Sequence, residues 1–442
     1  MHTYREALDI LNRFINYERS QPASYSPETL NLDRVNLLLD RLGRPDRQFR
    51  SIHIAGTKGK GSTAAMIESV LRAAGYRTGL YTSPHLHTFR ERMRVNNELI
   101  SRENFATTFN LIEAHVNAIE GITWFEIVTA LAFTYFAQSK IDVGVIEVGL
   151  GGRFDATNVL QPIVSVITSL SLDHMNLLGN TLEQIAFEKA GIIKPKIPVV
   201  SSPQRPEALA VIEKTAQERN APLVVVGKEV TFEILTSSID GQEFSVTAQN
   251  GAIHSYKIPL LGAHQASNAA TAITTLKVAE QDGLSITHEA IASGLTKVKW
   301  PGRLEILSRD PLLVVDGAHN ADSAQKLAQS LHDIFGDQTW TLIIGISADK
   351  DIPAILDALF PIASRIIVTR AHNVRAADLE SLAEKVVQHN LQPSITATVQ
   401  DAIDLALNDH NAIIVTGSLF TVADAREAWF DRSGLSLPEK DE

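Results

Sequence analysis

The sequence predicts an α/β fold of two domains, residues 1–300 and 301–442, each built on a mostly parallel sheet. The chain has 442 residues, more than one hydrophobic core usually serves. From Ser51 onward, apolar runs of β type alternate with helical patterns, an order typical of parallel sheets wrapped by helices. Pro301-Gly302 is a dipeptide suited to a hinge, and after it the alternation of strand and helix restarts.

The first domain begins with an amphipathic pattern. Leu8, Leu11 and Ile15 share one face of a helix expected over residues 4–19, and a loop rich in Pro and Ser follows at 21–27. Strands are expected at 51–55, 78–81, 142–148, 163–168 and 197–201. The apolar stretch 122–137 contains Glu126 and is too short to cross a bilayer, so it predicts a buried helix.

Residues 224–258 interrupt the alternation with short extended runs. Asp240-Gly241 and Asn250-Gly251 are hairpin turn signals, so we expect a small antiparallel flap there, followed by a helix over 264–281. Beyond the hinge, strands are expected at 312–315, 341–346, 365–369 and 412–415 with helices between them. This pattern predicts a second, smaller doubly wound domain of about 140 residues.

Composition excludes several classes of protein. A formal net charge of −11 argues against a nucleic-acid partner, because such binding relies on clustered Lys and Arg. The absence of cysteine excludes disulfides and thiolate metal sites. The first twenty residues carry six charged side chains and lack the apolar core of a signal peptide. We therefore expect a cytoplasmic protein without a membrane partner.

A glycine-rich loop joins the first expected strand to a helical pattern. It reads Gly56-Thr57-Lys58-Gly59-Lys60-Gly61-Ser62. Glycines let backbone N–H groups approach phosphates, Lys60 is placed to reach the β and γ phosphates, and Ser62 to bind Mg²⁺. The loop departs from the strict P-loop pattern at Ile54 and Gly61. The alternative is a glycine-rich turn with two solvated lysines.

Three polar residues follow expected strands, where parallel sheets bring ligands. Glu147 ends an apolar strand and begins a glycine-rich turn, His174 follows the strand at 163–168, and Ser83 follows the strand at 78–81. A carboxylate in this place suits a hard cation. The alternatives are a strand-end acid that caps its own turn, a surface histidine and a turn serine.

Several blocks, in their order and spacing, resemble the folylpolyglutamate synthase and dihydrofolate synthase family of the Mur ligase superfamily. The most specific is Glu147-Val148-Gly149-Leu150-Gly151-Gly152-Arg153-Phe154-Asp155-Ala156-Thr157-Asn158. The others are the glycine-rich loop and residues 82–86, 123–126, 171–174, 188–194, 261–270, 301–305, 316–320 and 416–419. The resemblance spans residues 30–430 and implies a P-loop nucleotide-binding domain, a smaller Rossmann-like C-terminal domain and an active site between them.

The resemblance implies roles for individual residues. ATP would be bound by Gly56, Thr57, Gly59, Lys60, Gly61, Ser62, Asn268 (adenine), Arg303 (triphosphate) and Asp316 (ribose). Mg²⁺ would be bound by Ser62, Ser83, Glu147 and His174, and the family is compatible with a monovalent cation such as K⁺. The substrates would meet Arg153, Asp155, His319 and Ser418. Lys60, His174, Lys189 and His319 would form the catalytic set.

Lys189 has two competing interpretations. It lies near the end of a helical pattern before Gly191, where a cation complements the helix dipole. In the resembling enzymes this lysine can be carbamylated, which turns an ammonium into a carboxylate. The chemistry is reasonable because a lysine of lowered pKa is nucleophilic.

The implied reaction is ATP-dependent amide formation between L-glutamate and a folate or dihydropteroate carboxylate, through an acyl phosphate. The sequence leaves open which of the two substrates is used, or whether both are. Three alternatives remain: a cell-wall Mur ligase, a mechanical or regulatory P-loop ATPase and a non-catalytic P-loop nucleotide-binding protein. A monomer is expected.

Overall fold

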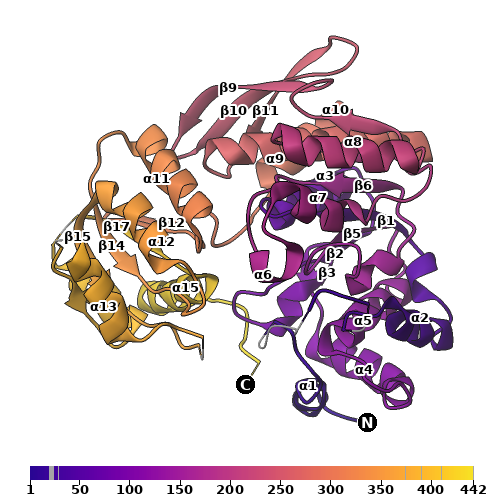
Figure 1. Cartoon of the computed structure of the whole chain (residues 1–442), viewed down its shortest axis with the longest axis horizontal. Helices are drawn as coiled ribbons and strands as arrows, with labels where there is room; N and C mark the ends of the chain where they lie inside the picture. Colours follow the sequence, from indigo (N-terminus) through magenta and orange to yellow (C-terminus); the bar gives the residue numbers. More distant parts are fainter. Residues whose placement is uncertain (19–23, 28, 374, 390, 410, 442) are drawn as a thin grey trace.

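The computed structural model describes residues 1–18, 24–27, 29–373, 375–389, 391–409 and 411–441. Figure 1 shows two α/β lobes, with the N-terminal one on the right and the C-terminal one on the left. Each lobe contains its own mainly parallel sheet, which confirms the predicted fold class. A third, three-stranded sheet lies at the top of Figure 1.

The N-terminal sheet has eight strands in the order β4-β3-β2-β5-β1-β6-β7-β8. They are β1 (Arg50–Ala55), β2 (Thr78–Tyr81), β3 (Met93–Val95), β4 (Glu98–Leu99), β5 (Val143–Glu147), β6 (Val164–Ile167), β7 (Val199–Ser201) and β8 (Leu223–Val225). Strands β2, β5, β1, β6, β7 and β8 are parallel, whereas β3 and β4 add an antiparallel edge that the sequence did not predict.

Helices cover both faces of this sheet. One face packs on α3 (Lys60–Ala73), α9 (Ala263–Ala279) and α10 (His288–Lys297). The other packs on α2 (Leu32–Arg41) and α5 (Trp124–Gln138) at one end and on α7 (Leu182–Ala190) and α8 (Pro206–Glu218) at the other. Helices α1 (Tyr4–Leu11) and α4 (Arg102–Val116) extend the α5 layer, and the short α6 (Met175–Leu178) follows β6. The central strands are therefore buried on both faces.

Two sequence predictions concern helices of this domain. Helix α5 is the predicted buried helix, and Glu126 lies in its first turn, where its carboxylate accepts a hydrogen bond from Thr123 N at 2.7 Å. The first helix is shorter than predicted, because α1 ends at Leu11 with Asn12, a weak helix former, as its C-cap. Residues 19–23 of the predicted helix and loop lie outside the described residues. No helix in the described part of the chain is long and apolar enough to span a membrane.

The predicted flap is a three-stranded antiparallel sheet of β9 (Thr231–Ser238), β10 (Gly241–Thr247) and β11 (Ile253–Ile258). Strand β9 contacts α9 of the N-terminal domain and also α11 of the C-terminal domain. The flap thus touches both domains above the space between them (Figure 1).

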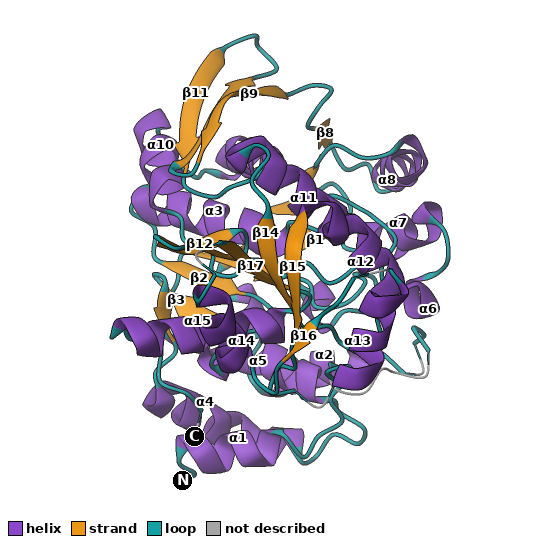
Figure 2. Cartoon of the chain, turned by 90° about the vertical axis from the view of Figure 1, so that its left-hand side faces the viewer, coloured by secondary structure: helices purple, strands orange, loops and turns teal. Residues whose placement is uncertain are grey.

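The C-terminal sheet has the order β12-β13-β17-β14-β15-β16. Its strands are β12 (Glu305–Arg309), β13 (Leu312–Val315), β14 (Trp340–Ile344), β15 (Ala363–Val368), β16 (Ser394–Ile395) and β17 (Ala412–Thr416), and only β12 pairs antiparallel. Helices α11 (Ala321–Phe335), α12 (Ile352–Leu359) and α13 (Leu379–Gln388) cover one face, and α14 (Val399–Leu407) and α15 (Leu419–Ser433) cover the other. Figure 2 places this domain in front, with α15, α14 and α13 toward the viewer.

Candidate active site

A cavity of about 1130 Å³ lies between the two domains. Its lining comes largely from loops at the carboxyl ends of parallel strands: the loops after β1, β2, β5 and β6 on one side, and those after β13, β14 and β17 on the other. Ligands of open parallel sheets bind at such ends. The cavity is somewhat larger than is usual for a site that binds one small molecule, which suits more than one ligand.

The glycine-rich loop forms one wall. Helix α3 starts at Lys60, within this loop, and the first helical hydrogen bond runs from Thr63 N to Gly59 O. Gly59 has a φ of 86°, and a Cβ there would lie 2.3 Å from Asn268 Oδ1 on α9. Only glycine lets the loop turn and touch α9 at this point. The N–H groups of the first turn of α3 are thereby directed at the cavity, as an anion site requires.

Glu147 stands at the end of β5 beside this loop. Its carboxylate accepts a hydrogen bond from Ser83 N at 3.1 Å and lies 3.8 Å from Lys60 Nζ. Burial raises the pKa of Glu147, and the nearby Lys60 lowers it only in part. The hydroxyl-bearing Ser62 and Ser83 also line the cavity. Carboxylate and hydroxyl oxygens fit a hard cation such as Mg²⁺. Among the described residues no three His, Asp or Glu side chains gather as a complete metal site.

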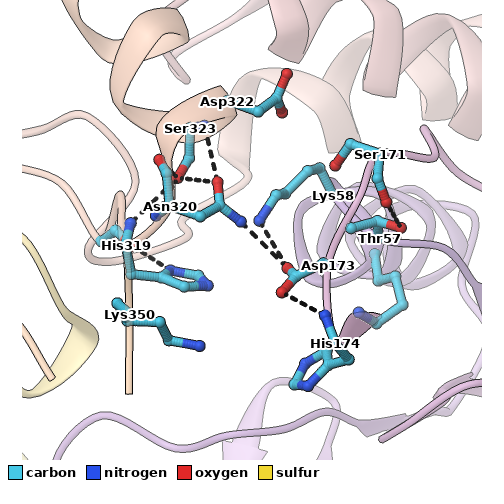
Figure 3. A network of polar contacts seen from close by, with 12 residues as sticks. Thr57, Lys58, Ser171, Asp173, His174, His319, Asn320, Asp322, Ser323 and Lys350 are labelled. Atoms are coloured by element: carbon cyan, nitrogen blue, oxygen red, sulfur yellow. Dashed lines mark hydrogen bonds and ion pairs between the residues drawn. The ribbon is translucent and has the colours of Figure 1, made fainter. Parts of the chain in front are cut away.

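A polar network connects the loop after β6 with both domains (Figure 3). Asp173 Oδ2 accepts hydrogen bonds from Lys58 Nζ at 3.1 Å and from Asn320 Nδ2 at 3.2 Å. Burial raises the pKa of Asp173, but Lys58 and the histidines lower it more and hold it well below its usual range. Burial lowers the pKa of His174 to about 4, with Asp173 opposing. His174 is therefore neutral at physiological pH, as a metal ligand must be.

The C-terminal domain contributes four of the predicted site residues. Arg303 and Asp316 line the cavity beside Gly302 and Gly317. Asp316 accepts hydrogen bonds from Leu304 N and Ala318 N, both at 2.8 Å. Burial lowers the pKa of His319 to about 3, and its Nδ1 lies 2.8 Å from Gly317 O. Ser418 caps α15 by accepting from Thr421 N at 3.0 Å.

Three predicted residues do not line the cavity: Gly56, Lys189 and Arg153. Arg153 forms a bidentate ion pair with Glu188 on α7, at 2.7 and 2.9 Å. This pair connects the turn after β5 to α7, and the substrate role of Arg153 stays a prediction. Asp155 does line the cavity, but its oxygens accept from Gly149 N, Leu150 N and Thr157 N at 2.9 to 3.0 Å. Asp155 therefore shapes the glycine-rich turn after β5.

Lys189 lies behind the wall that carries Lys60 and Asp173. It is 5% exposed, and burial, together with the charge of Lys60, lowers its pKa to about 7. Within the described residues its ammonium makes no hydrogen bond or ion pair. A Cβ on Gly191 would lie 2.5 Å from Arg153 Cβ, so glycine is needed where the end of α7 meets the turn after β5. The burial of Lys189 does not fit a solvated lysine that caps the helix.

Sequence reasoning missed several residues of the site. Lys58 and Asn320 belong to the network of Figure 3. Lys350 and Arg375 line the C-terminal side of the cavity, and Arg375 pairs with Asp349 at 3.0 Å. Asp349 and Lys350 follow the strand β14, so the strand-end rule that found Glu147 would have found them. Arg375 lies in a long polar loop and gave no such signal.

Comparisons with known proteins bear on this site. The family model of the Mur ligase middle domain matches residues 54–276, and that of the Mur ligase glutamate ligase domain matches 302–419. The dihydrofolate synthase/folylpolyglutamate synthase of Bacillus subtilis is 38% identical over 90% of this chain and 94% of its own length. The chain belongs to the folylpolyglutamate synthase and dihydrofolate synthase family of Mur ligases.

Solved structures of this family have the same fold. The Mycobacterium tuberculosis folylpolyglutamate synthase complexed with ADP superimposes with a TM-score of 0.87 at 33% identity, covering 96% of this chain and 98% of that one. An FPGS complex with AMPPCP and folate gives a TM-score of 0.83 at 35% identity, covering 96% and 99%. Members of the family therefore bind adenine nucleotides and folate on this fold.

Proposed function

We propose that this protein is an ATP-dependent ligase that joins the amine of L-glutamate to a carboxylate of a folate or dihydropteroate substrate. The observation that carries the proposal is the shared cavity, in which the phosphate-binding loop of one domain faces the cationic loops of the other. Sequence relatives with this activity in their names cover nearly the whole chain. Both substrates and ATP are anions, and the cavity provides cations for each.

ATP is proposed to bind with its phosphates on the first turn of α3. The loop residues Thr57, Gly59, Lys60, Gly61 and Ser62 would hold the phosphates, and Gly56 would let β1 turn into the loop. Asn268, which touches Gly59, and Asp316 would orient the nucleoside. Arg303 would contact the phosphates from the C-terminal domain, because its planar donors match phosphate oxygens.

Mg²⁺ is proposed to be held by Ser62, Ser83, Glu147 and His174. When bound, it would neutralise charge on the transferring phosphoryl group. Because the protein would supply only a few of the ligands of Mg²⁺, water and phosphate oxygens would complete its coordination. A monovalent cation such as K⁺ remains an additional prediction.

Lys189 is proposed to carry a carbamate. A neutral lysine amine adds to CO₂, and the low pKa of about 7 keeps much of this amine neutral at physiological pH. The carbamate would replace a buried ammonium by a buried anion close to Lys60 and the metal site. It would thereby remove the repulsion between two neighbouring ammonium groups.

The glutamate is proposed to bind on the C-terminal side. His319 and Ser418 were predicted from the sequence, and Lys350 and Arg375 line the same side. Two cations suit the two carboxylates of glutamate, with the amine directed at the acyl phosphate. The Ser418 hydroxyl oxygen already accepts the capping hydrogen bond from Thr421 N, so it would act mainly by fixing α15.

The chemistry follows from the need to activate a carboxylate. The substrate carboxylate attacks the γ-phosphate of ATP, ADP leaves, and the glutamate amine then displaces phosphate from the acyl phosphate. Water would hydrolyse that intermediate, so the two domains must close over it. A hinge at Pro301-Gly302, with domains of residues 1–300 and 301–442, suits this motion. Monomeric state and cytoplasmic residence remain predictions.

The experiment that tests the proposal measures ADP release by the purified protein with Mg-ATP and glutamate. Separate reactions contain dihydropteroate, a reduced monoglutamyl folate or a UDP-muramyl substrate. Glutamate-dependent release with either of the first two supports the proposal and decides between the two folate activities. Release with the muramyl substrate alone would instead establish the cell-wall alternative. A protein that binds ATP but turns over none of them would be a non-catalytic relative.

A further inference from the structure

Asp173 occupies a junction between three segments of the chain. It lies in the loop after β6, between the phosphate-binding loop and the start of α11 (Figure 3). One carboxylate oxygen, Oδ2, accepts from both Lys58 Nζ and Asn320 Nδ2, at 3.1 and 3.2 Å. The other, Oδ1, accepts from His174 N at 3.0 Å. Lys58 belongs to the N-terminal domain and Asn320 to the C-terminal domain, so this carboxylate connects the two.

Both partners are themselves fixed in place. The backbone N–H of Lys58 donates to Ser169 O at 3.0 Å, which ties the phosphate-binding loop to the loop after β6. Asn320 is the N-cap of α11, and its Oδ1 accepts from Ser323 N at 3.0 Å. The Asn320 amide thus makes two different hydrogen bonds: Oδ1 caps α11, and Nδ2 donates to Asp173 of the other domain.

The position of this junction relates it to the chemistry. His319 directly precedes Asn320, and its backbone N–H donates to Ser323 Oγ at 3.1 Å. The backbone N–H of Asn320 donates to the same hydroxyl oxygen at 3.1 Å, so Ser323 holds both Asn320 and His319 in place. The side chains of Lys58 and Asp173 are only 19% and 14% exposed, so water screens their interaction weakly.

We propose that Asp173 is a positioning residue that docks the C-terminal domain on the phosphate-binding loop, through the bridge Lys58–Asp173–Asn320. The bridge joins the two domains, so it stabilises the closed arrangement and holds His319 in the cavity that the phosphate-binding loop also lines. The consequence for catalysis rests on the proposed function. The consequence for domain closure does not.

Asn320→Ser is the decisive variant. Serine is as good an N-cap as asparagine, so α11 keeps its cap, but serine has no amide to reach Asp173. Asp173→Ala removes both halves of the bridge and also the contact with His174 N. Asp322→Asn is the matched control, because Asp322 lies in the same first turn of α11, pairs with Lys326 at 2.9 Å and makes no contact with Asp173.

Domain closure can be measured directly, because the chain has no native cysteine. Gln217→Cys on α8 and Glu384→Cys on α13 place two exposed thiols on different domains for a pair of fluorescent dyes. Single-molecule energy transfer with Mg-ATP then reports the ratio of closed to open molecules. We expect Asn320→Ser and Asp173→Ala to lower this ratio about tenfold, equivalent to about 1.4 kcal/mol, with Asp322→Asn within twofold of the unmodified protein.

Kinetics provide the second readout. Asn320→Ser should lower kcat/KM for glutamate about tenfold, while the equilibrium dissociation constant for ATP changes less than threefold, since the phosphate-binding loop is intact. An unchanged closed fraction in Asn320→Ser would overturn the bridge, whatever Asp173→Ala does. An equal loss in Asp322→Asn would overturn it too, because charge alone would then explain the effect. If the unmodified protein shows no ligase activity, the proposed function fails and the closure measurement still decides on Asp173.

Discussion

The proposed carbamate on Lys189 can be tested, because its formation depends on how often the lysine amine is unprotonated. With a pKa of about 7 in place of 10.5, its amine at pH 7 is about half neutral, whereas an ordinary lysine is neutral in roughly 0.03% of molecules. The amine is thus roughly a thousandfold more available to CO₂ than that of a surface lysine. We expect carbamate at Lys189 in bicarbonate buffer at pH 7 to 8, measured by ¹³C NMR with labelled bicarbonate.

Two substitutions separate the carbamate from a structural role. Lys189→Ala should lose activity and regain part of it with short carboxylic acids, because the vacated space admits a carboxylate. Lys189→Met keeps the volume of the side-chain stem, so it should be equally inactive and gain nothing from the acids. Full activity of the alanine variant, or equal rescue of both variants, would refute the carbamate.

The same pKa predicts the direction of a stability change. The folded pKa lies below that of the unfolded chain, so between pH 7 and 10.5 the unfolded state binds the extra proton and the free energy of unfolding rises with pH. Below this window the buried ammonium destabilises the fold. In buffer free of CO₂, Lys189→Met should therefore gain stability relative to the unmodified protein at pH 6, measured by urea unfolding. A helix-capping lysine would instead give a loss of ~0.3–1 kcal/mol.

Three further predictions concern the wall of the cavity in front of Lys189. Lys60→Ala should lower ATP turnover by about a hundredfold or more, with unchanged circular dichroism, and turnover near normal would remove the phosphate-binding assignment. Glu147→Gln and His174→Ala should each raise the Mg²⁺ concentration for half activity by about tenfold or more, so unchanged metal titrations would contradict the metal site. Gly59→Ala should lower the free energy of unfolding by ~1–3 kcal/mol more than Gly75→Ala. Both glycines have positive φ, but only at Gly59 would the new Cβ clash with a neighbour, Asn268. Equal losses in the two variants would mean that the Asn268 side chain moves aside.

Local patterns in the sequence predicted most of the fold. Strands β1, β5 and β6 are short runs of Val and Ile bounded by polar turns, and they lie within one or two residues of their predicted ends. The phosphate-binding loop and Glu147 were found because the chain itself places them at strand ends. The antiparallel edge of β3 and β4 was missed, since strands of three and two residues carry too little pattern to recognise.

The polar contacts of the site could not be predicted in this way. Asp173 meets Lys58 across 115 residues of sequence and Asn320 across 147. Nothing local distinguishes these residues from solvated side chains, because their partners are chosen by the packing of two domains. Arg153 shows a related case, since a residue within the most specific motif pairs with Glu188 and does not line the cavity, and its substrate role stays a prediction. A motif fixes the path of the backbone more reliably than the direction of each side chain.

The distribution of charge in the cavity explains how an acidic protein binds several anions. The chain has a formal net charge of −11, yet among the residues that the structure describes nine Lys and Arg against eight Asp and Glu line the cavity. Several of its cations stand beside acids, as in Lys58 with Asp173, Lys60 with Glu147 and Arg375 with Asp349. Each acid holds a flexible cation in one position, so little reorganisation is needed when phosphate or carboxylate binds. Removal of one of these acids should then harm catalysis by displacing its cation, even though the cavity becomes more positive.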